Sequence, residues 1–394
     1  MTIVAEIGTA HNGSLEKAKK LIDLAKNAGA DAVKFQWVYA DEILHPDTGY
    51  VKLPGGNIRL YDSFKKLECD KNFYKKCLDY AHSQNLLFYC SPFGLKSLKE
   101  LISIKPDAVK IASPEVNHIP LLKEIAKTCS KIKVIISSGV SKLCDLENAI
   151  SILSPVKDLT LLHCITSYPA PEEEYNVKCI ETLRNIFGIK TGLSDHSRDA
   201  VLVPVLSVVF GSVMIEKHIT ISNDTDGLDD KVALTGEQFA HMVHCVHQSQ
   251  AVLNRYSKDQ IFTPIKTDSD EQKNFGQGQI LSLGQCEILR QLSQQYDTDK
   301  IKAVIGSGIK KLALSEKENY GKTNRSLHYM KDLKKGHVLK AEDIGVLRTE
   351  KVLTTGISPA FLETAEGAVL QQDVSSGQGV QFIHLIEHED FHKM

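Results

Sequence analysis

Short apolar runs alternate with amphipathic stretches along the first 255 residues of the chain. The runs are continuously apolar rather than alternating, which is typical of strands buried on both faces of a parallel sheet. We expect strands at 3–8, 32–37, 86–91, 108–113, 133–138, 159–165, 190–194 and 212–219. The pattern therefore predicts eight successive strand–helix units.

The stretch after the first strand shows the helical pattern clearly. Ser14 is a suitable N-cap and Gly29 a suitable C-terminal stop. Apolar residues recur at helical spacing between them, and these are Leu15, Ala18, Leu21, Ile22 and Ala25. We expect this face to pack against the sheet.

Eight strand–helix units predict a (β/α)8 barrel that closes near residue 255. An open, doubly wound sheet is the competing architecture. The missing G-x-G-x-x-G after the first strand and the count of eight both favour closure. We expect a barrel over 1–255 and a linker over 256–321, with one possible helix at 281–295. A small, mostly β domain over 322–394 follows, because two Asp-x-x-x-Gly turns recur at 331–336 and 372–377.

Composition narrows the class of protein. The net charge of −2 gives no bulk positive surface for nucleic acid, and no apolar run reaches the ~20 residues of a membrane helix. The N-terminal residues carry no basic segment or long apolar core, so we expect no signal peptide. The nine cysteines lack a Cys-x-x-Cys pair, and we expect reduced core residues in a cytoplasmic protein.

Polar residues occur late in the apolar strands, at the end where barrel enzymes carry their chemistry. Burial of such groups without a partner is costly, so together they predict a shared polar cavity. The set comprises Glu6, Lys34, Gln36, Lys110, Ser113, Ser137, Ser138, Ser194, Asp195, His196, Glu216 and His218.

Lys34 and Lys110 each interrupt an apolar strand and indicate an anion site, with Ser113, Ser137 and Ser194 as hydroxyl donors. Either lysine could instead be a Schiff-base nucleophile, or extend its ammonium to solvent at a strand end.

His196 and His218 end neighbouring strands, about 4.8 Å apart in a sheet, so both imidazoles could bind one divalent metal. Glu216 points to the same side as His218. Two hydrogen-bonded structural histidines remain the alternative. A further series, His241, His244 and His247, lies on a helix whose apolar face uses other residues, so we expect it at the surface.

These residues lie in motifs that together resemble the sialic acid synthase family, which makes N-acetylneuraminate, legionaminate and pseudaminate. The motifs are AEIG (5–8), HNG (11–13), AGADAVKFQ (28–36), SPF (91–93), LHC (162–164), YP (168–169), GLSDH (192–196) and EKH (216–218). The resemblance extends over 2–250 and 302–385. It implies a barrel followed by an antifreeze-like SAF domain.

The resemblance also implies an activity and a set of roles. The family condenses phosphoenolpyruvate with an open-chain 2-acetamido sugar such as N-acetylmannosamine and releases phosphate by C–O cleavage. His196 and His218 would hold Mn2+ or Mg2+, and Glu6 would lie beside the sugar aldehyde. Lys34, Ser91, Lys110, Ser113, Ser137 and Ser194 would bind phosphoenolpyruvate, whereas Tyr168, Glu216 and Asp229 would hold or activate the sugar. The family forms a domain-swapped homodimer, in which Arg348 would reach the partner subunit's active site.

Two other functions remain open from the residues alone. Lys110 could be the covalent amine of a Schiff-base aldolase on the same barrel. A non-catalytic barrel that binds an acidic sugar would account for the fold, but less well for so many buried charges.

Overall fold

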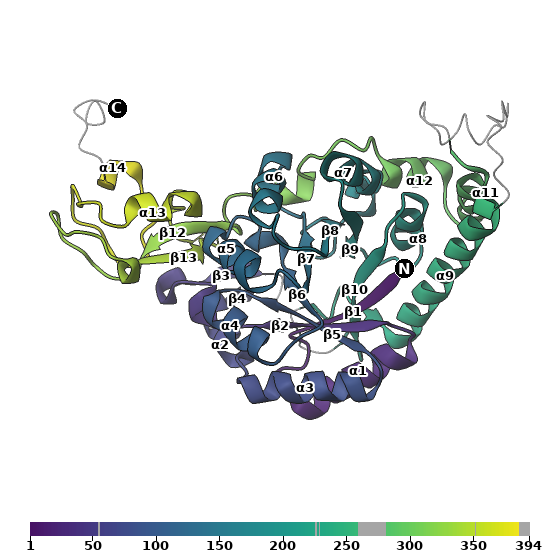
Figure 1. Cartoon of the computed structure of the whole chain (residues 1–394), viewed down its shortest axis with the longest axis horizontal. Coiled ribbons are helices and arrows are strands. Elements are labelled where there is room, and N and C mark those ends of the chain that lie inside the picture. Colours follow the sequence, from purple (N-terminus) through teal and green to yellow (C-terminus); the bar gives the residue numbers. More distant parts are fainter. Residues whose placement is uncertain (54–55, 225–226, 228, 259–280, 351, 386–394) are drawn as a thin grey trace. The chain divides into compact units, whose positions relative to one another are not determined.

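The computed structural model of the chain describes residues 1–394 except 54–55, 225–226, 228, 259–280, 351 and 386–394 (Figure 1). Its main sheet has eight parallel strands in the order β1-β2-β5-β6-β7-β8-β9-β10, and β10 pairs back with β1. Their bounds are β1 Thr2–Gly8, β2 Ala32–Trp37, β5 Leu87–Pro92, β6 Ala108–Ile111, β7 Lys133–Ser137, β8 Leu159–Cys164, β9 Lys190–Asp195 and β10 Met214–Thr220. The predicted closed barrel is confirmed, and the open sheet is excluded.

The helices follow the strands as the apolar periodicity predicts. In α1, Ser14 accepts a hydrogen bond from the backbone N–H of Lys17, and Ala18, Leu21, Ile22 and Ala25 are buried. The barrel helices are α1 Leu15–Asn27, α2 Leu60–Leu67, α3 Lys71–Ser83, α4 Leu95–Ser103, α5 Ile119–Thr128, α6 Leu143–Ile152, α7 Cys179–Phe187, α8 Leu202–Val209 and α9 Gly236–Lys258. Two short strands, β3 Val51–Leu53 and β4 Gly56–Ile58, pair with each other between β2 and α2, and β11 Leu234–Thr235 pairs in parallel with the end of β10.

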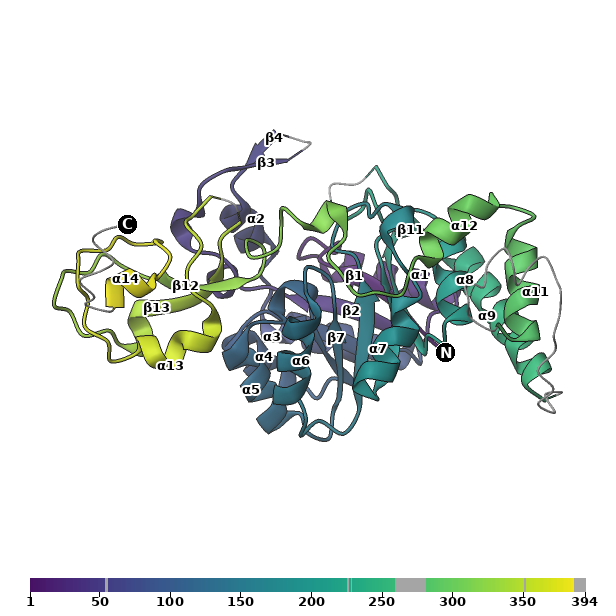
Figure 2. The same ribbon diagram turned by 90° about the horizontal axis from the view of Figure 1, so that it is seen from above.

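Residue contacts divide the chain into two compact units, which are described separately below. The first unit comprises 1–35, 79–88 and 160–315, and the second comprises 36–78, 89–159 and 316–394. In the first unit α8, α9 and the later helix α11, Leu283–Leu292, pack together (Figure 2). The predicted helix at 281–295 is therefore present but shorter.

A second helix in the predicted linker, α12 Thr298–Ile305, has no counterpart in the sequence prediction. Asp297 caps it by accepting hydrogen bonds from the backbone N–H groups of Asp299 and Lys300.

In the part of the chain that the structure describes, no helix is both long and apolar enough to cross a membrane. All nine cysteines are free, but Cys144 is exposed, so the expectation of nine core cysteines is wrong at that position.

The C-terminal residues of the second unit form a small β domain around the antiparallel pair β12 Arg325–Tyr329 and β13 Ile344–Arg348, followed by α13 Leu362–Ala365 and α14 Phe382–Leu385. Its core contains Leu327, Tyr329, Leu333, Leu339, Ile344, Ala365, Leu370, Val374 and Val380.

The two repeated turns of this domain pair with each other. Leu333 and Val374 exchange backbone hydrogen bonds of 3.0 Å in both directions. Asp373 accepts from the N–H of Lys335 at 2.9 Å, and Asp332 accepts from the N–H of Ser376 at 2.8 Å. Each copy of the repeat thus caps the turn of the other.

Candidate active site

In the first unit, a buried group of charged and polar side chains lies at the ends of β1, β2, β9 and β10. Lys34 Nζ lies 2.8 Å from Glu6 Oε1 and 3.9 Å from Glu216 Oε1. Ser194 donates a 2.9 Å hydrogen bond to the same oxygen of Glu216. The strand register explains the grouping, because Glu6 pairs with Lys34 on one side and with His218 on the other. Each side chain is almost fully buried, so their charges interact strongly.

The two predicted metal-binding histidines lie beside this group. The rings of His196 and His218 have their centres 5.5 Å apart, at the ends of neighbouring strands. His196 Nδ1 lies 2.8 Å from the carbonyl oxygen of Ile165, so this nitrogen is an N–H donor and Nε2 is the nitrogen left to bind a metal once it is deprotonated. The same ring nitrogen lies 3.8 Å from Cys164 Sγ. Two imidazoles this close can offer two nitrogen donors to one divalent ion, and an ion such as Mn2+ or Mg2+ would take the oxygen ligands that it prefers at its other positions.

The pKa values of these two imidazoles shift in opposite directions. Burial lowers the pKa of His218 to about 4, although nearby Asp229 opposes the shift, so His218 is neutral near pH 7. Burial also acts to lower the pKa of His196, but Cys164 and the Ile165 carbonyl outweigh it and raise the pKa to about 9. A metal that binds both rings would therefore displace a proton from His196.

Tyr168 and Asp229 complete the group in the first unit. The ring centre of Tyr168 lies 4.3 Å from that of His196 and 6.1 Å from that of His218. Asp229 Oδ2 lies 3.8 Å from His218 Nδ1. Both side chains are partly exposed, unlike the lysine cluster. No cluster of three or more His, Cys, Asp or Glu is arranged to hold a metal within the described residues. Water or substrate oxygens would therefore have to complete the coordination of an ion held by the two histidines.

The second unit holds the remaining predicted phosphate-binding residues, at the ends of β5, β6 and β7. Lys110 donates a 2.7 Å hydrogen bond to Ser137 Oγ, with both side chains buried. Ser113 Oγ accepts from the backbone N–H of Gly139 at 3.0 Å. Ser91 is fully buried, and its hydroxyl has no hydrogen-bond partner among the described residues. A buried hydroxyl without a partner costs free energy, which a bound ligand would recover.

Arg348 also belongs to the second unit, where it pairs with a residue of the same chain. Its Nη2 lies 2.6 Å from Glu115 Oε1, and its guanidinium lies over the Phe93 ring. Glu115 also pairs with the fully buried Arg325 at 2.5 Å. Burial alone would raise the pKa of Glu115, but the two arginines outweigh it and hold the pKa below its usual value. The expected contact of Arg348 with a partner subunit remains a prediction.

Sequence reasoning missed two residues that position His196. Lys217 Nζ lies 2.6 Å from Asp195 Oδ2 and 2.5 Å from the carbonyl oxygen of Ser197, on either side of His196. The hydroxyl oxygen of Tyr175 accepts hydrogen bonds from the backbone N–H groups of His196 and Ser197, at 2.7 and 3.0 Å. Lys217 could have been identified from the sequence, because it is a charged residue in a strand that is buried on both faces. Tyr175 lies in a loop and could not have been.

The histidine series on α9 has the structural role that the sequence indicates. His241, His244 and His247 are exposed, whereas Phe239 and Val246 on the same helix are fully buried. The series takes no part in the buried groups at the strand ends.

Comparison with known proteins identifies both parts of the chain. The model of the NeuB family matches residues 21–258, and the model of the SAF domain matches residues 324–385. An N,N'-diacetyllegionaminic acid synthase from Campylobacter jejuni is 30% identical over 375 residues, which cover 93% of this chain and 95% of that protein.

Two solved structures resemble the chain. A spore coat polysaccharide biosynthesis protein from Bacillus subtilis is 27% identical, with a TM-score of 0.77 and coverage of 98% of this chain and 96% of the other. An N-acetylneuraminic acid synthetase from Leptospira borgpetersenii, solved with citrate, is 29% identical, with a TM-score of 0.59. Its match covers 69% of this chain and 88% of the other.

Proposed function

The chain belongs to the NeuB family, and from this premise we propose that it is a nonulosonic acid synthase. It would condense phosphoenolpyruvate with an open-chain 2-acetamido sugar such as N-acetylmannosamine. The observation that carries the proposal is the buried group around Lys34, with its two carboxylates and the two adjacent imidazoles. Buried charges stabilise a fold poorly, so a cluster of them is better explained by the binding of a charged substrate.

The donor is a trianion, and its binding requires positive charge and hydroxyl donors. We assign Lys34, Ser91, Lys110, Ser113, Ser137 and Ser194 to phosphoenolpyruvate. The support is the burial of both lysines and the hydrogen bond of Lys110 to Ser137. A buried ammonium stabilises an anion more strongly than an exposed one, because the local dielectric is low.

We propose that His196 and His218 hold Mn2+ or Mg2+. The spacing of the rings and the orientation of His196, with Nδ1 on a carbonyl and Nε2 facing away from it, support such a site. With only two protein donors, most coordination positions would go to water and to oxygens of the sugar. The bound ion would supply Lewis acidity to polarise the sugar aldehyde.

The reaction forms one carbon–carbon bond and releases inorganic phosphate. C3 of phosphoenolpyruvate adds to the aldehyde carbon, positive charge develops at C2, and water attacks there. Phosphate then departs with cleavage of its bond to C2, and the 2-keto acid remains. Glu6, which is held by Lys34, would lie beside the aldehyde, and Glu216, which is fixed by Ser194, would act on the sugar together with Tyr168 and Asp229. These groups hold the reactants in a fixed orientation, which reduces the entropic cost of reaching the transition state.

The working form that we propose is a domain-swapped homodimer in the cytoplasm. The resemblance to the family supports the dimer, in which Arg348 contacts the sugar bound by the partner subunit. Nine free cysteines support a reducing compartment.

Phosphate release tests the proposal directly. The purified chain is incubated with phosphoenolpyruvate, Mn2+ and, in turn, N-acetylmannosamine or a 2,4-diacetamido-trideoxy hexose. Release that depends on one of these sugars and stops with EDTA supports the synthase. Borohydride trapping of pyruvate on Lys110 would instead support the aldolase. Sugar binding without any turnover would support the non-catalytic barrel.

A further inference from the structure

We propose that Glu316 and Asn324, in the segment that leads into the C-terminal domain, are positioning residues for the loop after β7. The loop comprises residues 138–141 and follows Ser137, so the kinetic part of this inference rests on the proposed function. The structural part, that two side chains from the connecting segment fix the shape of this loop, stands independently of that function.

Both polar groups of one loop residue are bound by the connecting segment. The backbone N–H of Val140 donates a 2.7 Å hydrogen bond to Glu316 Oε1. The backbone carbonyl of Val140 accepts a 3.2 Å hydrogen bond from Asn324 Nδ2. The two side chains come from positions more than 170 residues later in the chain, yet they hold the two peptide groups that flank one residue, Val140.

The loop needs such a restraint because Val140 has an unfavourable backbone conformation. Its φ angle is 41°, in the left-handed region that glycine adopts readily and β-branched residues avoid. A strained residue keeps this conformation only where its surroundings fix it. Hydrogen bonds to both the N–H and the carbonyl of Val140 meet that condition.

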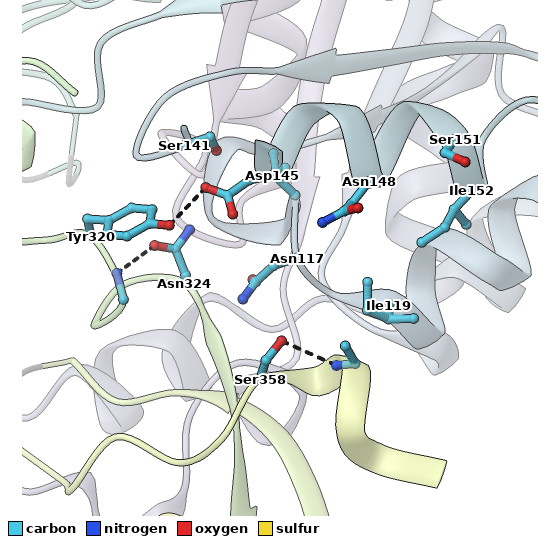
Figure 3. Close-up of a pocket in the computed structure, with 13 residues that line it drawn as sticks. Asn117, Ile119, Ser141, Asp145, Asn148, Ser151, Ile152, Tyr320, Asn324 and Ser358 are labelled. Carbon is cyan, nitrogen blue, oxygen red and sulfur yellow. Dashed lines mark hydrogen bonds between the residues drawn. The ribbon is translucent and has the colours of Figure 1, made fainter. Parts of the chain in front are cut away.

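Burial makes these hydrogen bonds difficult to replace with water. Val140 and Glu316 are fully buried, and Asn324 is 6% exposed. The amide of Asn324 is itself oriented, since its Oδ1 accepts from the backbone N–H of Gly321 at 2.8 Å (Figure 3). In the same view the hydroxyl of Tyr320 donates to Asp145 on α6, which anchors the connecting segment beside the loop.

The loop is tied in turn to residues assigned to the phosphate donor. The backbone N–H of Gly139 donates to Ser113 Oγ, and Ser137 at the start of the loop accepts from Lys110. Release of Val140 would therefore shift Gly139 and weaken the fixed position of the Ser113 hydroxyl. We infer that the link to the C-terminal domain controls the geometry of the phosphoenolpyruvate site through this loop.

Four variants of the full chain test the inference. Glu316→Ala removes the acceptor, Glu316→Gln keeps an oxygen in its place, and Asn324→Asp keeps the acceptor for Gly321 but removes the donor to Val140. Glu318→Ala is the matched control, because Glu318 is exposed in the same turn. The readouts are hydrogen exchange of a peptide covering 138–141, measured by mass spectrometry, and steady-state kinetics with both substrates varied.

We expect exchange in 138–141 to rise about tenfold in Glu316→Ala and the KM for phosphoenolpyruvate to rise by a similar factor. The kcat and the KM for the sugar should stay within about twofold of the wild type, because the loop makes no proposed contact with the sugar. Glu316→Gln should behave nearly as the wild type, because it keeps an acceptor oxygen. Asn324→Asp should show a smaller increase in exchange and in KM than Glu316→Ala, and Glu318→Ala should show none.

The outcomes separate the two parts of the inference. Unchanged exchange in both Glu316→Ala and Asn324→Asp would overturn the role of the two residues in holding the loop. Faster exchange with an unchanged KM for phosphoenolpyruvate would overturn the link to donor binding. If the wild type releases no phosphate from phosphoenolpyruvate, the proposed function fails, and the exchange data still decide the structural part. Should Glu316→Ala not fold, Asn324→Asp against the wild type provides the same comparison, with Glu318→Ala as the control.

Discussion

The ion pairs of Glu115 with Arg325 and Arg348 offer a sharp test of what holds the second unit together. Replacement of Glu115 by alanine removes the carboxylate that forms the 2.5 Å ion pair with Arg325. The guanidinium of Arg325 has no exposed surface, so it would lose its charge partner without access to water. Such a change leaves a buried charge uncompensated, which is among the most destabilising single substitutions.

The expected magnitude follows from the contacts that remain. Loss of one partner of a buried ion pair costs about 3–5 kcal/mol. Arg325 keeps hydrogen bonds to the carbonyl oxygens of Phe93 at 2.8 Å and Val346 at 3.0 Å, which favours the lower limit. At about 3 kcal/mol and ~2–4 °C per kcal/mol for a unit of this size, the melting temperature should fall by about 6–12 °C.

The assay is differential scanning calorimetry at pH 7, with Glu363→Ala as the control. Glu363 pairs with Lys123 at 2.6 Å, but their side chains are 80% and 55% exposed. An exposed pair of this kind contributes less than about 1 kcal/mol, so the control should melt within about 4 °C of the wild type. A Glu115→Ala protein that melts as high as the control would refute the reasoning.

The pH dependence gives an independent check on the same residue. The pKa of Glu115 is lower in the folded chain than in the unfolded chain, because the two arginines outweigh burial. Its contribution is therefore complete above the unfolded pKa of about 4.3 and is lost as the pH falls through the folded pKa. The difference in melting temperature between the wild type and Glu115→Ala should stay constant from pH 8 to about pH 5. It should shrink only in more acidic solution.

Three further substitutions or deletions test the candidate active site. His218→Ala should abolish phosphate release even at saturating Mn2+ while the melting temperature stays within about 3 °C, and unchanged activity would contradict the metal site. Lys217→Met should lower the melting temperature by about 6–12 °C, because Asp195 would remain buried without its ammonium partner, and a fully stable variant would contradict this reading. Deletion from Lys322 onward should eliminate phosphate release while circular dichroism still shows a folded barrel. A fully active truncated protein would remove the C-terminal domain from the mechanism.

The strands were predictable because a strand that is buried on both faces consists of consecutive apolar residues. The second strand matches its prediction at both ends, and the others differ by one or two residues where polar strand ends blur the pattern. The helix α12 was missed because its eight residues offer too few turns for a clear period. Long amphipathic helices can be predicted from the spacing of their apolar residues. A short capped helix depends on local hydrogen bonds that this spacing does not reveal.

The candidate site divides in the same way. Lys34 and His218 were found because a charged residue late in an apolar strand stands out. The partners were not predictable, because Glu115 and Arg325 are 210 residues apart in sequence and meet only through the fold. Glu115 lies two residues beyond the predicted strand at 108–113, so the search for polar residues late in strands did not reach it. Val140 and Glu316 carry no signal of their own, since strain and its restraint appear only in three dimensions.

The paired turns of the C-terminal domain make its two halves interdependent. Asp332 and Asp373 each complete the hydrogen bonding of the opposite copy, so neither copy is satisfied alone. A fragment that ends between the copies would lose these two hydrogen bonds and also the backbone pairing of the buried residues Leu333 and Val374. A substitution at either aspartate therefore acts on the turn of the other copy, some forty residues away, rather than on its own turn.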